Sequence, residues 1–452
     1  MRLFYQILLL TIIFSGCTSD KHSLPENVTA EDGVTTEDNI YLELNKWMYK
    51  EMNIYYLWRQ DMPDSLDCDY DLAPRDFYYS LLSKKDRFSY FTNNDNYKPR
   101  STNANLGFAY QTMLDKDGNT ALEILYIQSN TLKKHGFKRG DLVRVSNQSD
   151  ESYIINKVHT KNDVFKDDAT TYKISILGTT ENSSVLLDTV YTDADKRIGY
   201  LCYLGYEDKS DLDKPLKRFK SEQITDLILD LRYNPGGYVS TCKFLCNCIV
   251  TEDAYGKLFQ QCSYNDILSA EYLKKTGDSR SYSYFDRPNE MPGESLGVTL
   301  TPLNLKRLYV ITSCNTASAS EATIICLKTY MPVTIIGEQT VGKGVGSTII
   351  SDPRFRYAIQ PIIMRYYNAD GVTTPDDGIP PDIYLQDGYQ TKKTEIGDTN
   401  ERLLNAALRC ISDNYTPEEN PSRAITEHSL TPIGEPSYVT DSSFASSKIV
   451  SE

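Results

Sequence analysis

A serine and a lysine, each set among small residues, are the pair in this sequence best suited to chemistry. Ser318 lies in the run TASASE (residues 316–321), and Lys343 stands between two glycines 25 positions later. A serine hydroxyl is a poor nucleophile until a neighbouring base takes its proton. Lysine can be that base when burial disfavours its charged form and lowers its pKa. We expect one helix and one strand between the two residues to return the lysine to the serine.

The histidines offer no comparable partner for the serine. A Ser-His-Asp triad is recognised by its geometry rather than by spacing along the chain. His22 and His428 lie in polar terminal regions, and His135 and His159 lie far upstream of the serine. None has a sequence context that indicates a triad.

Composition narrows the class of protein. A chain of 452 residues predicts two to four domains. The net charge of −14 argues against a nucleic-acid partner, because a phosphate backbone requires a basic surface. The ten cysteines form no CxxC pair and have no histidine beside them, so we expect no metal site and no cofactor. The sequence does not exclude a disulfide bond, because exported proteins can form them.

The first residues read as a targeting segment. The apolar run over residues 3–14 follows a positive start and is short for a membrane span. The sequence FSGC that ends at Cys17 resembles the bacterial lipobox, which implies a signal peptide over 1–16 and lipidation of Cys17. A plain signal peptide with an incidental cysteine is the alternative. Residues 17–38 are polar and predict a flexible tether.

The remaining chain divides into four parts. Helical spacing of apolar residues predicts a small helical domain over 39–100, and short strands with turns predict a β-domain over 105–190. From 195 to 412, strands alternate with helices, which indicates an α/β domain with a mostly parallel sheet. Residues 413–452 lack periodicity and predict a disordered tail.

Three segments of the α/β domain follow strands, where sites in such sheets form. They are residues 230–237 (DLRYNPGG), 316–321 (TASASE) and 337–344 (GEQTVGKG). In this order they resemble the S41 peptidases, the C-terminal processing (tail-specific) proteases and their tricorn-core relatives. Residues 377–382 (DGIPPD) resemble the closing segment of that family. The resemblance extends from residue 39 to 411 and implies a ClpP/crotonase-like protease core.

The resemblance also implies catalytic roles. It makes Ser318 the nucleophile, with Ser320 as a minor alternative, and Lys343 the general base. In some members an acidic residue three positions after the serine assists, and this position is Glu321. In others a glutamine four positions after the lysine orients it. Here Ser347 takes that place, so the partner of the lysine stays open between Ser347 and Glu321.

The same resemblance implies an oxyanion hole formed by main-chain N–H groups of Ala319 and of Gly236 or Gly237. Two glycines after a strand allow N–H groups to face a developing oxyanion. Asp230 and Arg232 stand just before these glycines. We favour pairing between them at the strand end over a direct catalytic role.

The β-domain is similar to the PDZ domain that these proteases carry. Residues 136–142 (GFKRGDL) match a conserved PDZ turn, with Arg139 in place of the usual proline. A PDZ groove adds a peptide as an extra strand and holds its terminal carboxylate. The alternative is a structural β-domain without peptide affinity. The residues that match the carboxylate-binding loop are Leu106, Gly107, Phe108 and Ala109.

These features predict a lipid-anchored serine endopeptidase with a Ser-Lys dyad that cleaves proteins or peptides in the bacterial cell envelope. Its PDZ-like module would present substrate or gate the site, and homo-oligomerisation stays open. The alternative is a catalytically decayed lipoprotein that binds peptides or glycans, favoured by the departure at Ser347. A Ser-Lys hydrolase of non-peptide acyl groups is a weaker third reading, because that class has its lysine where Glu321 stands.

Overall fold

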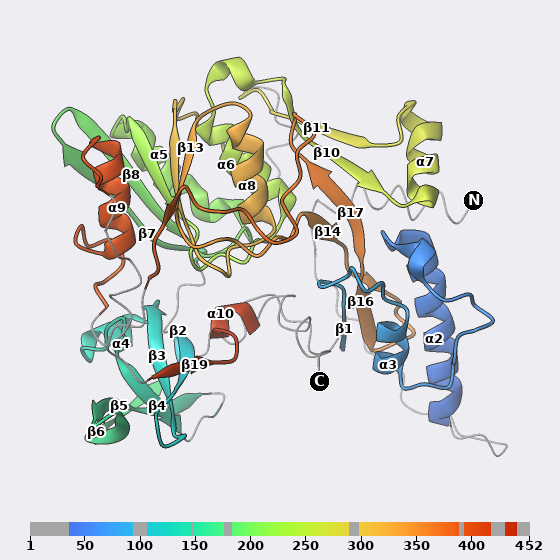
Figure 1. Ribbon diagram of the computed structural model, residues 1–452, viewed down its shortest axis with the longest axis horizontal. Helices are drawn as coiled ribbons and strands as arrows, with labels where there is room; N and C mark the ends of the chain where they lie inside the picture. The colour runs from blue at the N-terminus through green and yellow to red at the C-terminus, as the bar shows by residue number, and fades with distance from the viewer. Residues whose placement is uncertain are drawn as a thin grey trace.

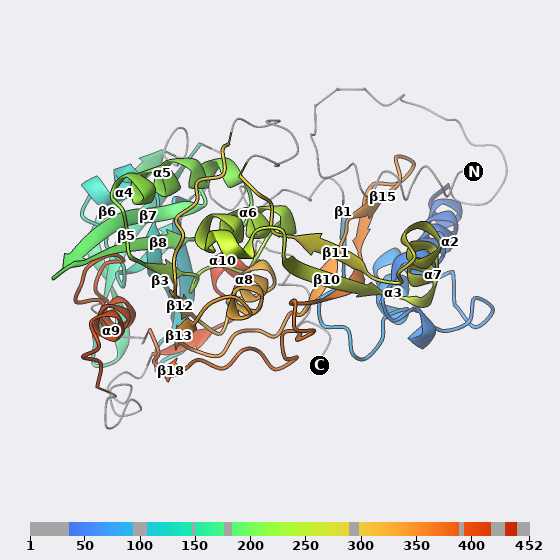
Figure 2. The same ribbon diagram turned by 90° about the horizontal axis from the view of Figure 1, so that it is seen from above.

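The computed structural model describes residues 36–93, 106–146, 149, 151–175, 183–288, 298–387, 393–416 and 430–440 (Figures 1 and 2). The signal peptide, the lipidation site Cys17 and the tether up to residue 35 lie outside these ranges, so the lipid anchor stays a prediction. Within the described ranges, no helix has the length and apolar character needed to cross a membrane.

A six-stranded sheet forms the centre of the α/β domain. Its strand order is β18-β13-β12-β9-β8-β7, and every pair is parallel except β7 with β8. The three central strands are short runs of almost only apolar residues, typical of strands covered on both faces. The strands are β7 (Val185–Asp193), β8 (Lys196–Tyr203), β9 (Asp226–Asp230), β12 (Leu308–Thr312), β13 (Val333–Gly337) and β18 (Ile383–Tyr384).

Helices cover both faces of this sheet (Figures 1 and 2). Leu227 and Leu229 of β9 pack with α5 (Asp213–Ser221), α6 (Val239–Ile249) and α8 (Ala319–Lys328) in one apolar cluster. Ile228, which points the other way, packs with α9 (Arg402–Ile411). The predicted α/β core with a mostly parallel sheet is therefore confirmed.

A second, antiparallel sheet extends from the core and was not anticipated from the sequence. Its order is β11-β10-β17-β14, with α7 (Asp266–Thr276) beside it. The strand β14 begins two residues after Lys343, so the lysine loop joins the two sheets. The strands are β10 (Leu258–Tyr264), β11 (Ser281–Tyr284), β14 (Val345–Ser347) and β17 (Ile362–Tyr367). Short 3-10 turns occur at Arg59–Asp61, Lys209–Leu212 and Glu252–Ala254.

The N-terminal unit contains α2 (Thr36–Tyr55), α3 (Pro74–Ser80) and one strand, β1 (Tyr90–Asn93). This strand pairs with β16 (Tyr357–Gln360), which also pairs with β15 (Ile350–Ser351). The prediction of a purely helical unit was therefore incomplete. Its β-prone aromatic end, YFT at residues 90–92, completes a sheet with strands from the far end of the core.

The β-domain is a sheet of order β19-β2-β3-β4-β5-β6 with one short helix, α4 (Asn130–Lys134). Its strands are β2 (Phe108–Leu114), β3 (Thr120–Ile127), β4 (Leu142–Ser146), β5 (Ser152–Lys161), β6 (Val164–Ser175) and β19 (Thr431–Ile433).

Two predicted domain boundaries were wrong. The strand β7 falls within the predicted 105–190 domain, but it belongs to the core sheet because it pairs with β8 along its whole length. The tail predicted to be disordered contains β19 and α10 (Ser437–Thr440). These two elements form because β19 pairs with β2 and because Tyr438 of α10 is buried between aromatic rings of the β-domain and the core.

Candidate active site

Ser318 occupies a sharp turn between β12 and α8. Its backbone has φ +56° and ψ −115°, a conformation that a residue with a side chain rarely adopts. Such strain persists only where surrounding contacts enforce it, and it is common at functional sites. The residue is half-buried and directly precedes the first residue of α8. The turn therefore presents a serine at the N-terminus of a helix.

The loop after β9 holds the serine turn in place. The Asn234 carbonyl accepts hydrogen bonds from the Ala317 N–H at 3.3 Å and from the Ser320 hydroxyl at 3.1 Å. Ser320 is fully buried by this contact, which makes it part of the support rather than a second nucleophile. Gly236 has φ +110°, and a Cβ there would lie 2.8 Å from the Cβ of Ser318. Only glycine fits so close to the serine.

The predicted oxyanion donors are not equivalent in this structure. The Gly236 N–H donates to Asn234 Oδ1 at 2.9 Å and so stabilises its own loop. Ala319 is the first residue of α8, a position where the N–H has no partner within the helix. Among the residues that the structure describes, the N–H groups of Ala319 and Gly237 donate no hydrogen bond, which leaves these two available for an oxyanion.

The carboxylate of Glu321 joins the serine turn to the lysine loop. Its Oε2 atom accepts from the N–H groups of Ser318 and Lys343, both at 2.8 Å. Its Oε1 atom accepts from the Gly342 N–H at 2.7 Å and from the Thr340 hydroxyl. Both oxygens are thus occupied by the two loops. Glu321 positions the main chain of both residues, a different role from the assisting one that the sequence suggested.

Tyr366 of β17 makes a second link between the loops. Its hydroxyl lies 2.7 Å from the Lys343 carbonyl and 3.1 Å from the Ser318 carbonyl. The side chain is almost fully buried. The serine and lysine main chains are therefore held side by side by a carboxylate on one side and a phenol on the other. Gly342 permits this, because with φ +90° a Cβ there would lie 2.3 Å from the Asp376 carbonyl oxygen.

Lys343 is withdrawn from water, with only 4% of its surface exposed. Burial lowers the pKa of Lys343 to about 8, although the charges of Asp86 and Glu321 act in the opposite direction. The Phe88 ring centroid lies 5.4 Å from Nζ. A substantial fraction of the lysine is therefore neutral near pH 8, as a general base requires.

The N-terminal unit supplies residues to this site that the sequence analysis missed. Arg87 donates to the Gly342 carbonyl at 3.3 Å and to the Asp376 carbonyl at 2.6 Å. Phe88 packs with Val345 beside the lysine. Residues 84–91 (KKDRFSYF) were visible only as a charged and aromatic run. Nothing in their local pattern connects them to a loop more than 250 positions away.

Ser347, at the position where the resemblance implies a lysine-orienting glutamine in some proteins, is itself paired with a glutamine. Gln360 of β16 donates from Nε2 to the Ser347 hydroxyl at 2.7 Å. β16 is also the strand that pairs with β1 of the N-terminal unit. The Ser347 hydroxyl, one of the two candidates for orienting the lysine, therefore accepts a hydrogen bond from a side chain of a distant strand.

Behind the catalytic loops lies a buried cluster of charges. Arg232 donates to Asp230 and makes two parallel hydrogen bonds to Glu401, at 2.8 and 2.9 Å. These bonds support the pairing role that was favoured for Asp230 and Arg232. Burial alone would raise the pKa of Glu401, but Arg232 holds it below its ordinary value.

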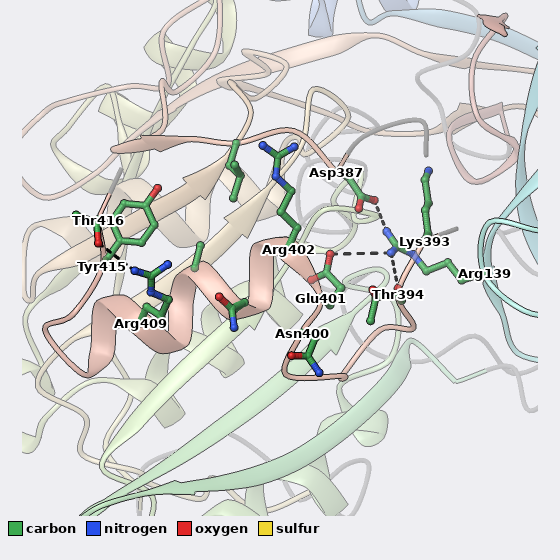
Figure 3. A pocket seen from close by; sticks show the side chains of 13 residues that line it. Arg139, Asp387, Lys393, Thr394, Asn400, Glu401, Arg402, Arg409, Tyr415 and Thr416 are labelled. Atoms are coloured by element: carbon green, nitrogen blue, oxygen red, sulfur yellow. Dashed lines mark hydrogen bonds and ion pairs between the residues drawn. The ribbon is translucent and has the colours of Figure 1, made fainter. Parts of the chain in front are cut away.

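Arg139 of the β-domain reaches into the same cluster. It contacts Asp387 and donates to the Thr394 carbonyl at 2.7 Å, and Figure 3 shows it pointing at Asp387 and Glu401. It also donates to the Tyr233 hydroxyl at 3.0 Å. The adjoining pocket of about 420 Å³ is lined by this cluster and by α9, on the face of the sheet opposite α8. Arg139 and Arg232 pair with Asp387 and Glu401 in this cluster, and these pairs anchor the β-domain to the core.

The four residues that match a carboxylate-binding loop are buried, and two of them begin β2. The Gly107 carbonyl accepts the N–H groups of Gln128 and Ser129, each at 2.9 Å. Phe108 and Ala109 pair with β3. Within the described ranges, no group of three or more metal-ligating side chains occurs.

Comparisons with known proteins identify the family. Residues 197–385 match the model of peptidase family S41, and residues 43–90 match the peptidase S41 N-terminal domain. Together the two matches span more than half of the chain. The chain belongs to peptidase family S41, as the sequence motifs suggested.

Two similar curated proteins are processing proteases. A carboxy-terminal-processing protease of Bartonella bacilliformis is 30% identical over 216 residues, covering 45% of this chain and 43% of that protein. The carboxy-terminal processing protease CtpB of Bacillus subtilis is 25% identical over 230 residues, covering 47% and 42%. These matches therefore span less than half the length of either relative.

A solved structure supports the fold over more of the chain. A crystal structure described as an S41 protease from Bacteroides fragilis superposes with a TM-score of 0.66 at 22% identity. It covers 87% of this chain and 100% of that one. The two chains therefore share a fold over most of this chain and all of that one.

Proposed function

We propose that this chain is a serine endopeptidase in which Ser318 is the nucleophile and Lys343 the general base. The observation that carries the proposal is the pair of hydrogen bonds from the Ser318 and Lys343 N–H groups to one oxygen of Glu321. This carboxylate holds together a strained serine and a buried lysine with a lowered pKa. Both are features of an activated nucleophile and its base.

The reaction follows from this arrangement. Neutral Lys343 accepts the proton of Ser318 as its oxygen attacks the carbonyl carbon of a peptide bond. The N–H groups of Ala319 and Gly237 stabilise the resulting oxyanion, each contributing about 10²–10³ in rate. Lys343 then returns the proton to the leaving amine, and water releases the acyl group from Ser318 by the same steps.

The substrates are proteins or peptides, consistent with the names of the relatives. The lipobox-like sequence at Cys17 supports a lipid-anchored protein in the bacterial cell envelope. Ser347 with Gln360 takes the place of the glutamine that orients the lysine in other members. The β-domain is a PDZ-like module, as supported by its strand order and by the turn that contains Arg139.

Hydrolysis of an unfolded protein substrate tests the proposal. Ser318→Ala and Lys343→Ala should each lower the rate by at least about 10³-fold, because members of such a pair act as a unit. The matched controls are Ser351→Ala and Lys328→Ala, both exposed residues, which should retain full activity. Peptide binding by a wild-type chain that hydrolyses nothing would instead favour the decayed binding protein.

A further inference from the structure

The outer edge of β2 is occupied by the chain's own C-terminal region, residues 430–440, here called the tail segment. The register pairs Thr431 with Leu114 and Ile433 with Thr112. Figure 1 shows β19 beside β2 and α10 between the β-domain and the core. A strand edge with no neighbour presents main-chain N–H and C=O groups that recruit extended chain. In this molecule the tail segment satisfies them.

The tail segment runs in the direction that a peptide captured by this edge would take. It is antiparallel to β2 and proceeds from the Leu114 end toward the start of the strand. Along this path Gln111 Nε2 donates to the Ile433 carbonyl at 2.9 Å, and the Tyr110 N–H donates to Ser437 Oγ at 2.9 Å. Peptides added to PDZ-type edges approach the loop before that strand with their terminal end.

Beyond β19, the tail segment reaches the catalytic loops. Tyr438 is 5% exposed, and its ring centroid lies 6.4 Å from that of Tyr126 in the β-domain and 5.4 Å from that of Tyr233 in the core. Asn315 Nδ2 donates to the Tyr438 hydroxyl at 3.2 Å. Asn315 is three residues before Ser318. The segment therefore covers a continuous route from the β2 edge to the serine turn.

The tail segment is held on this route mainly by Tyr438 and by Leu430, which packs against an apolar cluster of the β-domain. Only three residues of β19 pair with β2, and the central one, Pro432, has no N–H to donate. The side chains of Thr431 and Ile433 are exposed. A short edge strand of this kind opens at little cost, whereas the buried Tyr438 ring supplies most of the apolar burial.

The outer edge of β2 is the edge at which a PDZ-like sheet adds an extended peptide. We infer that the tail segment is the resident internal ligand of this edge, seated by Tyr438, and that it competes there with any other extended peptide. Another extended peptide can pair with β2 at this edge only after it displaces the tail segment. The inference rests on the PDZ-like module of the proposed function but not on the proposed protease activity, because the edge binds main chain whether or not Ser318 reacts.

A competition experiment tests this inference. The probe is a fluorescent peptide with the sequence of residues 430–440, followed by anisotropy, with Ser318→Ala in every chain to prevent cleavage. A chain that ends at residue 429 should bind the peptide at least about 10-fold more tightly than the full chain. A peptide carrying Tyr438→Ala should bind the shortened chain at least about 10-fold more weakly. Equal binding by the two chains, or none by a folded shortened chain, would overturn the inference.

A second measurement applies if the shortened chain does not fold. In the full Ser318→Ala chain, Tyr438→Ala should speed hydrogen exchange at the Tyr110 N–H, and excess wild-type peptide should restore its protection. The matched control is Tyr415→Ala, another aromatic residue near the C-terminal end of the core, which should leave this exchange rate unchanged. Unaltered protection at Tyr110 in the Tyr438→Ala chain would contradict the inference.

Discussion

Lys343 and Arg232 are both long basic side chains almost fully withdrawn from water, but their surroundings differ. Arg232 touches Asp230 and Glu401 directly through charged hydrogen bonds. Lys343 lies by the Phe88 ring, and the two carboxylates that favour its charged form, Asp86 and Glu321, accept hydrogen bonds from main-chain N–H groups. The pKa of Arg232 is raised well above its ordinary value, whereas burial lowers that of Lys343 to about 8.

The difference shows how equal burial can serve two purposes. Where counter-charges make direct contact, a buried cation stays charged and fixes the structure. Where the neighbouring carboxylates instead accept main-chain N–H groups, burial still disfavours the charged form of the cation. Loss of a proton removes this penalty, so the pKa falls. The first arrangement forms the cluster to which Arg139 of the β-domain binds, and the second suits Lys343 to its proposed role as a base. Substituting each cation by the same apolar residue tests this contrast.

The largest stability effect is expected for Arg232→Met. This change leaves Asp230 and Glu401 buried with fewer opposite charges, which should lower the free energy of unfolding by about 3–5 kcal/mol. Chemical denaturation with circular dichroism measures the change. Arg307→Met is a control, because Arg307 is about one-third exposed and pairs with Asp226 at the sheet edge, so a smaller loss is expected. An equal loss of unfolding free energy in both variants would contradict the stabilising role given to the buried contacts of Arg232.

Lys343→Met should shift stability in the opposite direction. Because the folded pKa is about 8 against an ordinary 10.5, the unfolded chain binds a proton between these pH values that the folded chain does not. Stability therefore falls as the pH is lowered through this window, and the full cost is present below it. Removing the amine should stabilise the chain by about 1–3 kcal/mol at pH 6.5, and by less at pH 9. A variant less stable than the wild type at pH 6.5 would contradict this prediction.

A smaller effect is expected at Phe88. Phe88→Ala should admit water to Lys343 and raise its pKa by up to about one unit, so that the rise of kcat/KM with pH moves upward. Phe88→Leu keeps the site dry but removes the ring's attraction for a cation, about 0.5–1 kcal/mol, and should move the rise downward by about half a unit. Profiles that shift in the same direction in both variants would refute the role given to the ring.

Local sequence was sufficient for the elements that carry the chemistry. The apolar runs that became β9, β12 and β13 each ended in a loop of small residues, and parallel strands bring such ends together. Ser318, Lys343 and Gly236 could therefore be predicted to converge.

The missed contacts depend on tertiary packing between distant segments. Phe88 and Arg87 reach the lysine loop because β1 pairs with β16, and a four-residue strand gives no signal of its partner. Gln360 reaches Ser347 through the same sheet. The tail segment appeared disordered because its composition is polar, whereas its order comes from one buried tyrosine and an open strand edge.

The most direct test of the central claim is the titration of Lys343 itself. In a chain labelled with ¹³C at lysine Cε, the signal absent from Lys343→Met identifies the residue, and its shift is followed against pH. We predict a midpoint at about 8, with kcat/KM rising through the same pH. A midpoint at or above the ordinary lysine value of 10.5 would contradict the claim that Lys343 is the base of Ser318.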